Sequence, residues 1–386
     1  MATLLNRRRY MGGGGGYPAD AIMTIDTNPE VLAICYAQGW CANAKYMTAS
    51  EAAAVTSIGT VFYNNKNIKH FEEFEYFTSV TSIAASGIRN CTNLKSLIIP
   101  VNVTSIGNDA LRDSGIESLY VNCDNTSWGN AYTFTNTPIK YLYSNSKNTT
   151  PSGTFSKLET LVLSQNVETL GGFRGAVLLE NVTMPDSLTT INSNCFRGCS
   201  KLLTLNVPSG VTSIGSDAFR ASGIKSIYIY GNISSWGTNA FAEMTLEYMY
   251  SNSQYTVPNT APASLIRLDL GSNVRGVGGF GSTSVSIVNI QEGAKTFYDN
   301  CFKNCSSLQS IVLPSTTSVM RDGVFHTCAN LTSVTILATT PPTGVSQYTF
   351  MSTPDAIVYV PSGSVDTYKA AGGWSQYASR IQAIPT

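Results

Sequence analysis

Charged side chains are scarce in this sequence. Asp, Glu, Lys and Arg make up 12% of the 386 residues, and 24 basic residues balance 24 acidic ones. A surface that tracks nucleic-acid phosphates needs an excess of Lys and Arg, so this balance argues against nucleic acid as a main partner. The sequence also lacks a run of about 18 apolar residues, the length needed to span a bilayer. We therefore expect no nucleic-acid partner and no membrane span.

Histidine is equally scarce, with two residues, His70 and His326. A general base tuned near neutral pH is most often a histidine, but both lie in the repeated part of the chain. The sequence also lacks G-x-S-x-G, H-E-x-x-H, G-x-x-x-x-G-K-[ST] and C-x-x-C, which are typical of serine hydrolases, zinc proteases, P-loop proteins and thioredoxin-like proteins. We predict that the protein is not an enzyme and has no catalytic residues, no metal site and no cofactor.

The informative feature that is present is repetition. The segment LKSLIIPVNVTSIGNDALRDSGI begins at Leu94, and LLTLNVPSGVTSIGSDAFRASGI begins at Leu202. These two starts are 108 residues apart, and shorter units recur every 19 to 23 residues or so. The short period is that of leucine-rich repeats. The long period indicates that a block of five units has been duplicated. Further units begin near Ile116, Ile139, Leu158, Leu179, Ile224, Leu246, Leu265, Val285, Leu308 and Leu331.

Each unit reads as one short strand followed by a turn and a return segment. In the unit that starts at Leu202, Leu205 and Val207 alternate as inward-facing strand residues, and Pro208 marks the turn. The return segment sends further apolar residues into the same core: Val211, Ile214, Ala218 and Phe219. One unit cannot bury these side chains alone, so the units must stack into a solenoid.

The repeated phrase resembles that of the BspA-like leucine-rich repeat family, roughly L-x-x-I-x-L-P-x-x-V-T-S-I-G-x-x-A-F-x-x-C-x-x-L. The match is close in Leu202–Ile224, in Leu179–Leu202 with Cys199, and in Leu308–Leu331 with Cys328. The resemblance covers roughly residues 68–385. It implies a β-rich leucine-rich-repeat solenoid with a small helical N-terminal cap and a C-terminal strand-helix cap. The family further implies surface adhesion and binding, and not catalysis.

The end of the chain looks like the usual terminal cap of this family. We expect the solenoid at residues 67–355 and the cap at residues 356–386, with a last strand at Ile357–Val360 and a short helix from near Ser364. A cap is also required physically, because the open end of a solenoid exposes strand edges and core.

Residues 21–66 have a different pattern, with a helix expected around Pro29–Tyr36 and a second beginning at Thr48. The segment Thr48-Ala-Ser-Glu51 is a capping box. This region is similar to an EF-hand or dockerin calcium loop, but Trp40, Ala42 and Ala44 stand where oxygen ligands are needed. We expect a helical N-terminal cap that binds no calcium.

The first 20 residues combine Arg7, Arg8 and Arg9 with five glycines at 12–16, and the order of regions in a secretory signal is not seen. The start LLNRRRYMGG is similar to openings of virion proteins of phages that infect gut Bacteroidales. On this resemblance residues 1–20 are an anchoring peptide whose arginines dock on virion structural proteins. The expected location is the exposed surface or tail fibres of a virion, and the alternative is the surface of a bacterial cell.

Nine cysteines leave at least one thiol unpaired in any scheme of intrachain disulfides. The pairs Cys195–Cys199 and Cys301–Cys305 belong to units 106 residues apart, five strands or about 24 Å along a stack. They cannot share a zinc ion with bonds of about 2.3 Å. We expect buried thiols that behave as small apolar side chains, with a disulfide inside each pair as the alternative.

Side chains alternate along a strand, so the residue between two inward positions faces outward on the strand-lined sheet. This column reads Ile98, Tyr120, Tyr143, Val162, Thr183, Asn206, Tyr228, Tyr250, Asp269, Asn289, Val312 and Thr335. Tyr141, Tyr230 and Tyr248 lie at adjoining outward positions, which predicts two tyrosine clusters, one in each duplicated block.

Rigid rings with a hydroxyl suit recognition of proteins or sugars. The alternative is that tyrosine favours strands and that the duplication copied it. The function we expect is non-enzymatic binding, with the strand-lined face presented to a protein or carbohydrate on a cell surface. A glycan-active enzyme, which needs two carboxylates about 5 to 9.5 Å apart, is the less favoured hypothesis.

Overall fold

The computed structural model describes residues 17–386 except 126, 256–260 and 354–355. Its residues fall into two compact units, unit 1 at residues 1–185 and unit 2 at residues 186–386. Arg7, Arg8 and Arg9, the anchoring residues predicted from the sequence, lie outside the described residues. No helix in the described part of the chain is both long and apolar enough to cross a membrane.

Unit 1 begins with a small α/β segment. The helices α2 (Pro29–Ala37) and α3 (Ala49–Ala54) confirm the two that were predicted. Thr48 caps α3: its hydroxyl accepts from the Glu51 backbone N–H, and the Glu51 side chain accepts from the Thr48 N–H, which is the predicted capping box. The sequence did not reveal the antiparallel strands β1 (Ala21–Thr24) and β2 (Tyr46–Thr48), which pair beside these helices.

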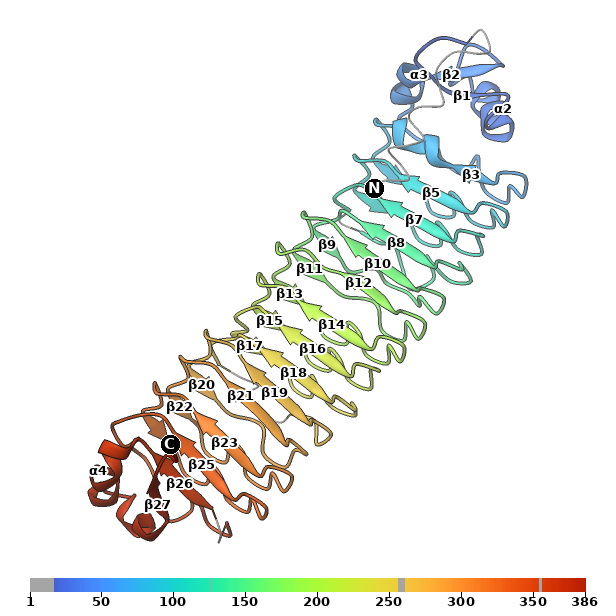
Figure 1. Cartoon of the computed structure of the whole chain (residues 1–386). Coiled ribbons are helices and arrows are strands. Elements are labelled where there is room, and N and C mark those ends of the chain that lie inside the picture. Colours follow the sequence, from blue (N-terminus) through green and yellow to red (C-terminus); the bar gives the residue numbers. More distant parts are fainter. Residues whose placement is uncertain (1–16, 126, 256–260, 354–355) are drawn as a thin grey trace. The chain divides into compact units, whose positions relative to one another are not determined.

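The rest of unit 1 is a β-solenoid, as predicted (Figure 1). Its strand-lined face is one parallel sheet in the order β12-β10-β8-β7-β5-β3, and β4 and β6 pair on the return side, as do β9 and β11. The strand-lined face consists of β3 (His70–Phe71), β5 (Ser96–Ile99), β7 (Ser118–Val121), β8 (Tyr141–Ser144), β10 (Thr160–Leu163) and β12 (Asn181–Thr183). The return side has β4 (Ser82–Ile83), β6 (Ser105–Ile106), β9 (Asn148–Thr149) and β11 (Thr169–Leu170), and the 3-10 helix η1 (Glu72–Tyr76) follows β3.

Unit 2 repeats this plan with two parallel sheets on its strand-lined face, β14-β16-β18-β19-β21 and β23-β25-β26-β27. These strands are β14 (Thr204–Val207), β16 (Ser226–Ile229), β18 (Tyr248–Ser251), β19 (Arg267–Leu270), β21 (Ile287–Ile290), β23 (Ser310–Leu313), β25 (Ser333–Ile336), β26 (Ile357–Val360) and β27 (Ile381–Ala383). The return side has β13 (Thr190–Ile191), β15 (Ser213–Ile214), β17 (Ser235–Trp236), β20 (Gly276–Val277), β22 (Thr296–Phe297) and β24 (Val319–Met320).

The predicted strand and helix at the end of the chain are confirmed by β26 and by α4 (Val365–Ala370), which lies between η2 (Ser362–Ser364) and η3 (Ser375–Arg380). The strand is not the last one, however, because β27 follows η3 and pairs with β26 in parallel. Tyr368 on α4 and Trp374 just before η3 are fully buried. Their polar atoms are satisfied, because the Tyr368 hydroxyl donates to the Ala338 carbonyl and the Trp374 indole N–H donates to the Pro342 carbonyl. The segment therefore covers the core of the last solenoid turn, which is what a cap must do.

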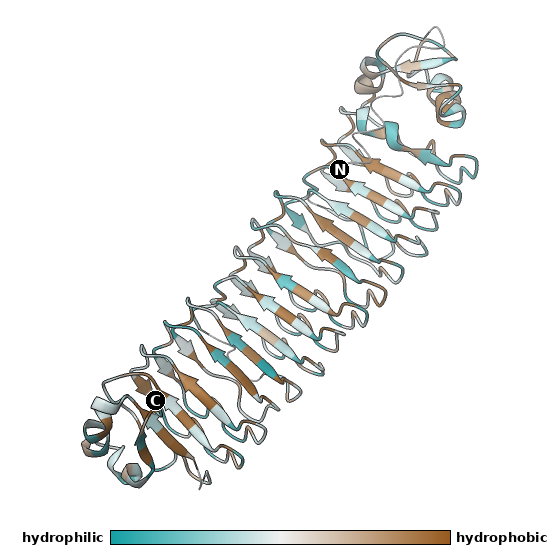
Figure 2. Cartoon of the chain, in the orientation of Figure 1, coloured by the Kyte–Doolittle hydropathy of each residue, from teal (hydrophilic) through white to brown (hydrophobic). Residues whose placement is uncertain are grey.

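The core forms because side chains at equivalent positions of successive turns stack on one another. Leu205, Ile214 and Phe219 are each at most 1% exposed, as predicted. Hydrophobic and hydrophilic residues alternate along many of the strands (Figure 2). The return segments add a row of rings in contact, and in unit 2 the row Phe280, Phe302, Phe325, Phe350 and Trp374 has centroids 5.6 to 6.3 Å apart. Such contacts add to the gain from area burial alone.

A left-handed residue makes the tight bend of the return segment possible. The Asp or Asn just before the buried Ala-Phe or Cys-Phe pair has a positive φ, for example 55° at Asp217, 57° at Asn239 and 57° at Asn300. Asp and Asn tolerate this conformation better than other residues with a Cβ. In the turn that contains Phe325, Gly323 takes the same place with φ 65°. The recurring D/N-A/C-F phrase is thus a bend followed by two core residues.

All nine cysteines are buried free thiols, so the disulfide alternative is wrong and the buried interpretation is confirmed. Several also form a contact between turns that the sequence did not reveal. The thiol of Cys91 donates to the Phe62 carbonyl at 3.0 Å, and the thiol of Cys328 donates to the Phe302 carbonyl at 3.0 Å. Thr137 makes the same contact in another turn. A small donor at this position therefore ties one turn to the turn before it.

One residue of the predicted outward column is misplaced. Ile98 is 1% exposed, although it alternates with the core residues Leu97 and Ile99. The reason is that η1 lies alongside β5 and that Tyr120 stands next to Ile98 in the parallel register. The first turn is irregular, and its 3-10 helix covers a position that stays open in later turns.

The thiol contact between turns predicts a graded effect of substitution at Cys328. C328A removes the hydrogen bond that the Cys328 thiol donates to the Phe302 carbonyl, and it leaves a small cavity. We therefore expect a loss of about 1–3 kcal/mol in the free energy of unfolding. C328T restores a donor of the kind found at Thr137, and its loss should be smaller. Urea unfolding followed by circular dichroism measures both. Equal losses in the two variants would show that the hydrogen bond contributes nothing.

Burial of the thiols also predicts a loss of stability in alkali. It raises the pKa of Cys91 to about 11 and those of Cys35, Cys123 and Cys328 to about 12, from an ordinary value of 9.0. Above pH 9 the unfolded chain therefore releases thiol protons that the folded chain keeps. The raised thiol pKa values should therefore contribute fully to the free energy of unfolding below pH 9, and this contribution should be lost between pH 9 and 12. Urea midpoints measured across this range provide the test, and a flat profile would contradict the burial.

Candidate ligand-binding surface

In each unit the outward tyrosines lie close together on that unit's own strand-lined face, as predicted. Tyr228 stands beside Tyr250 in the parallel register of β16 and β18, and Tyr120 stands beside Tyr143 in that of β7 and β8. All are half-buried or exposed, and Tyr230 is 45% exposed. The predicted residues are thus brought together in two groups: Tyr120, Tyr141 and Tyr143 in unit 1, and Tyr228, Tyr230, Tyr248 and Tyr250 in unit 2.

The unit 1 group is a small aromatic cluster. The ring of Tyr120 lies 5.4 Å from that of Tyr141 and 6.4 Å from that of Tyr143. Burial raises the pKa of Tyr141, and the neighbouring phenols add to the shift. The next strand, β10, places Thr160 and Val162 beside Tyr141 and Tyr143. The cluster therefore borders short neutral side chains.

The unit 2 group has two ring pairs, Tyr228–Tyr248 with centroids 5.3 Å apart and Tyr230–Tyr250 with centroids 5.4 Å apart. Here the next strand, β19, places Arg267 beside Tyr248 and Asp269 beside Tyr250. The Arg267 guanidinium lies 5.6 Å from the centroid of the Tyr248 ring, within the range of a cation–π contact. Rings, a cation and an anion are thus combined on one surface.

Asp269 is the polar centre of this surface. Its carboxylate accepts a hydrogen bond from the Tyr248 hydroxyl at 2.8 Å and another from the Asn289 amide at 2.7 Å. Arg267 donates to the same carboxylate from Nε, and its Nη2 lies 3.0 Å from Oδ2. Three neighbouring side chains therefore fix the carboxylate in one orientation. We call Tyr228, Tyr230, Tyr248, Tyr250, Arg267, Asp269 and Asn289 the Tyr–Asp patch.

The ionisation of the Tyr–Asp patch follows from these contacts. Burial raises the pKa of Tyr248 to about 12, and the hydrogen bond to Asp269 and the charge of Asp269 add to the shift. Burial opposes the ionisation of Asp269, but hydrogen bonds from Arg267, Asn289 and Tyr248 outweigh it and hold the pKa of Asp269 below its ordinary value. Near neutral pH the patch therefore combines a fixed anion at Asp269, a cation at Arg267 and a neutral phenol at Tyr248.

The polar part of this patch distinguishes unit 2 from its internal copy. Aligned through the duplication, Arg267 and Asp269 correspond to Thr160 and Val162 in unit 1, and Tyr230 corresponds to Asn122. The tyrosines were thus kept in both blocks, whereas an ion pair and an extra ring are found in one. The sequence identified Asp269 and Asn289 as members of the outward column, but it gave no sign that Arg267 and Asn289 would converge on Asp269.

The patch ends at a break in the strand-lined face. In the described part of unit 2, β21 pairs with β19 but no ladder joins it to β23. Val288 and Ile290 occupy inward positions of β21, yet both are half-buried, whereas Leu268 and Leu270 on β19 are buried. Apolar side chains are therefore partly open to solvent next to Asn289.

Comparison with known families identifies the family of these repeats. The family model described as BspA type leucine-rich repeat region matches in six copies, over residues 56–172, 154–261 and 263–360. The chain belongs to the BspA-type leucine-rich repeat family. The family resemblance inferred from the repeated phrase is thereby confirmed, and no curated protein matches the chain significantly.

Several solved structures resemble this BspA-type chain. A leucine-rich repeat protein from Bacteroides ovatus is 18% identical, with 83% of this chain and 82% of that chain covered and a TM-score of 0.45. A leucine rich cell surface protein from Faecalibacterium prausnitzii is 19% identical, with 85% and 86% covered and a TM-score of 0.30. The pneumococcal vaccine antigen PcpA is 15% identical, with 79% and 83% covered and a TM-score of 0.30.

The other residues weighed as candidate sites have structural partners. The His326 ring nitrogen Nδ1 is 2.9 Å from the Thr327 hydroxyl. The Glu51 carboxylate, which the calcium-loop resemblance would assign to a cation, accepts from the backbone N–H groups of Ala42 and Thr48. These contacts account for the positions of His326 and Glu51 without a ligand.

The bond between Tyr248 and Asp269 predicts a measurable shift. D269N removes the negative charge that opposes formation of the phenolate, so the pKa of Tyr248 should fall from about 12 toward 10.0. Burial remains, so part of the shift should stay. Difference absorbance near 295 nm during alkaline titration measures this, with Y248F identifying the signal. An unchanged titration in D269N would contradict the bond.

Proposed function

We propose that this chain is a non-enzymatic binding protein that contacts a cell surface through the Tyr–Asp patch. The observation that carries the proposal is the divergence of the two blocks, because unit 2 adds Arg267, Asp269 and Tyr230 around tyrosines that unit 1 also has. Membership in the BspA-type family supports it, since this family implies surface adhesion and binding. The unit 1 cluster of Tyr120, Tyr141 and Tyr143 is the secondary contact in this proposal.

The chemistry of the patch suits carbohydrate or protein. Tyrosine rings offer apolar faces at low entropic cost, and their hydroxyls can form hydrogen bonds at the edge of the contact. Asp269 is held in place before any ligand arrives, which reduces the ordering cost of binding. The half-buried Val288 and Ile290 extend the patch with an apolar margin. The outward column of unit 2 supplies one carboxylate, whereas glycoside hydrolysis uses a pair.

Two locations are proposed for this activity. In the first, residues 1–20 with Arg7, Arg8 and Arg9 attach the chain to a phage virion, and this rests on the resemblance of the opening residues. In the second, which family membership supports, the chain is an adhesin on a bacterial cell surface or is secreted. Mass spectrometry of purified particles and of cell fractions separates them. In both, residues 21–66 and 356–386 serve as caps and 67–355 as the solenoid.

The proposal predicts that binding depends on unit 2 more than on unit 1. We expect the labelled full chain to bind cells of some gut Bacteroidales strains, and Y248A to weaken binding about tenfold or more, as loss of an aromatic anchor does. The matched control is Y141A, which removes the corresponding tyrosine of unit 1 and should have a smaller effect. Flow cytometry over a concentration series gives both affinities.

The nature of the ligand is resolved with the same cells. Periodate treatment destroys surface sugars and protease treatment removes surface proteins, so one of the two should abolish binding. Equal affinity of Y248A, Y141A and the unchanged chain would refute the assignment to the Tyr–Asp patch. Release of soluble product during binding would instead indicate a glycan-active enzyme.

A further inference from the structure

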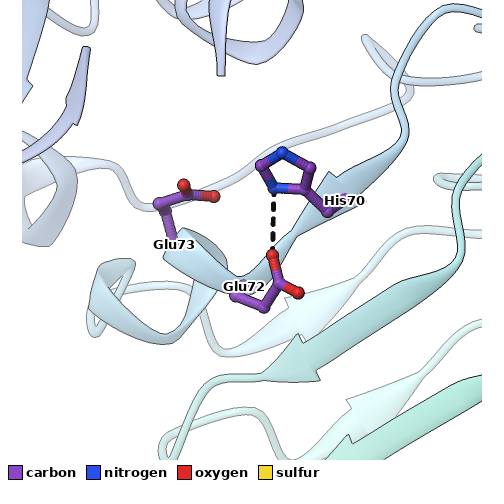
Figure 3. A group of neighbouring side chains, drawn as sticks. All are labelled: His70, Glu72 and Glu73. Carbon is purple, nitrogen blue, oxygen red and sulfur yellow. Dashed lines mark ion pairs between the residues drawn. The ribbon is translucent and has the colours of Figure 1, made fainter. Parts of the chain in front are cut away.

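Three potential metal ligands converge at the beginning of the unit 1 solenoid. His70 lies on β3, and Glu72 and Glu73 begin η1 (Figure 3). One ligand atom from each of the three side chains lies within 4.8 Å of the other two. They meet because β3 is two residues long and runs directly into a 3-10 helix, so the chain bends at once. A continuing strand would have placed His70 and Glu73 on opposite faces.

Neutral donors from other elements hold both carboxylates. The Ser96 hydroxyl on β5 donates to Glu72 Oε1 at 2.6 Å. The Asn28 amide, at the N-terminus of α2, donates to Glu73 Oε2 at 2.9 Å and to the His70 carbonyl at 3.1 Å. Partners that orient the ligands in this way are typical of metal sites.

The charge in this cluster calls for a cation. Glu73 is half-buried, and within the described part of the chain no Lys or Arg forms an ion pair with it. His70 Nδ1 lies 3.0 Å from Glu72 Oε2, so a protonated imidazole could pair with this carboxylate. Buried carboxylates are stabilised by a partner charge, by a proton or by a metal ion.

We propose that His70, Glu72 and Glu73 bind one divalent transition-metal ion, with Zn²⁺ as the best match. An imidazole nitrogen with two carboxylate oxygens suits Zn²⁺, whereas Mg²⁺ and Ca²⁺ prefer oxygen ligands throughout. Three protein ligands leave a fourth tetrahedral position for water. The bound ion would join β3 and η1, and through Asn28 and Ser96 it would stabilise the contact of α2 and β5 with them.

The test is titration of the full chain with Zn²⁺ in competition with a chromophoric chelator. We expect one tight equivalent, with the affinity reduced tenfold or more in H70A and in E73Q. E73Q keeps the size of the side chain and an oxygen for Asn28, so it decides the question if H70A does not fold. The matched control is H326A, which removes the other histidine of the chain and should leave the affinity unchanged.

Thermal unfolding gives an independent readout. Zn²⁺ should raise the Tm of the unchanged chain and of H326A, because an ion that binds the folded state stabilises it. The rise should be lost in E73Q. If the unchanged chain does not bind Zn²⁺, or if E73Q and H70A bind it as tightly as the unchanged chain, the proposal is overturned. The second result would mean that the ion binds elsewhere on the chain.

Discussion

The structure depends on the in-register stacking of parallel strands. Each turn buries its inward side chains only because the next turn places equivalent side chains over them, as Ile227 and Ile229 lie beside Leu205 and Val207. The backbone ladder sets the register, and the register brings ring next to ring and thiol next to carbonyl. Core, bends and surface columns are therefore consequences of one repeated hydrogen-bonding pattern.

Charged pairs at corresponding positions show how the two duplicated blocks have diverged. Glu117 is hydrogen-bonded by Lys140 at 2.8 Å in unit 1, whereas in unit 2 Lys225 donates to Glu247 at 2.8 Å. The two pairs occupy corresponding positions with the signs exchanged. Exposed pairs of this kind contribute little to stability. Complementarity between neighbouring strands was nevertheless kept while the individual residues changed, and the tyrosines beside them were kept as tyrosines.

Most of the fold could be predicted from the sequence because a repeated phrase states the same structural rule many times. Inward positions such as Leu205, Ile214 and Phe219 and the helix cap at Thr48 follow directly from pattern and spacing. β26 was expected from the resemblance of the chain's end to the family's terminal cap, but β27 after it was not. The exceptions lie where the repetition stops. Ile98 is covered by η1, whose form depends on the irregular first turn. The strands β1 and β2 do not belong to a repeat, so no periodicity in the sequence reveals them.

The candidate sites were less predictable, because they depend on neighbours that the repeat does not specify. The tyrosine columns followed from alternation, but the contacts of Asp269 with Arg267 and Asn289 depend on side-chain conformations across three strands. The cluster of His70 with Glu72 and Glu73 requires a 3-10 helix immediately after a two-residue strand. In a longer strand, the spacing of three residues would place His70 and Glu73 on opposite faces.

The break between β21 and β23 gives unit 2 a mechanical property. On the return side the ladder β20-β22-β24 runs without interruption through the same turns, since Thr296 on β22 pairs with Gly276 and with Val319. On the strand-lined side, in the described residues, no backbone ladder joins the two sheets. Tension along the stack would thus open the strand-lined side first, with the return side acting as the pivot. A contact made at Asn289 would then respond to load.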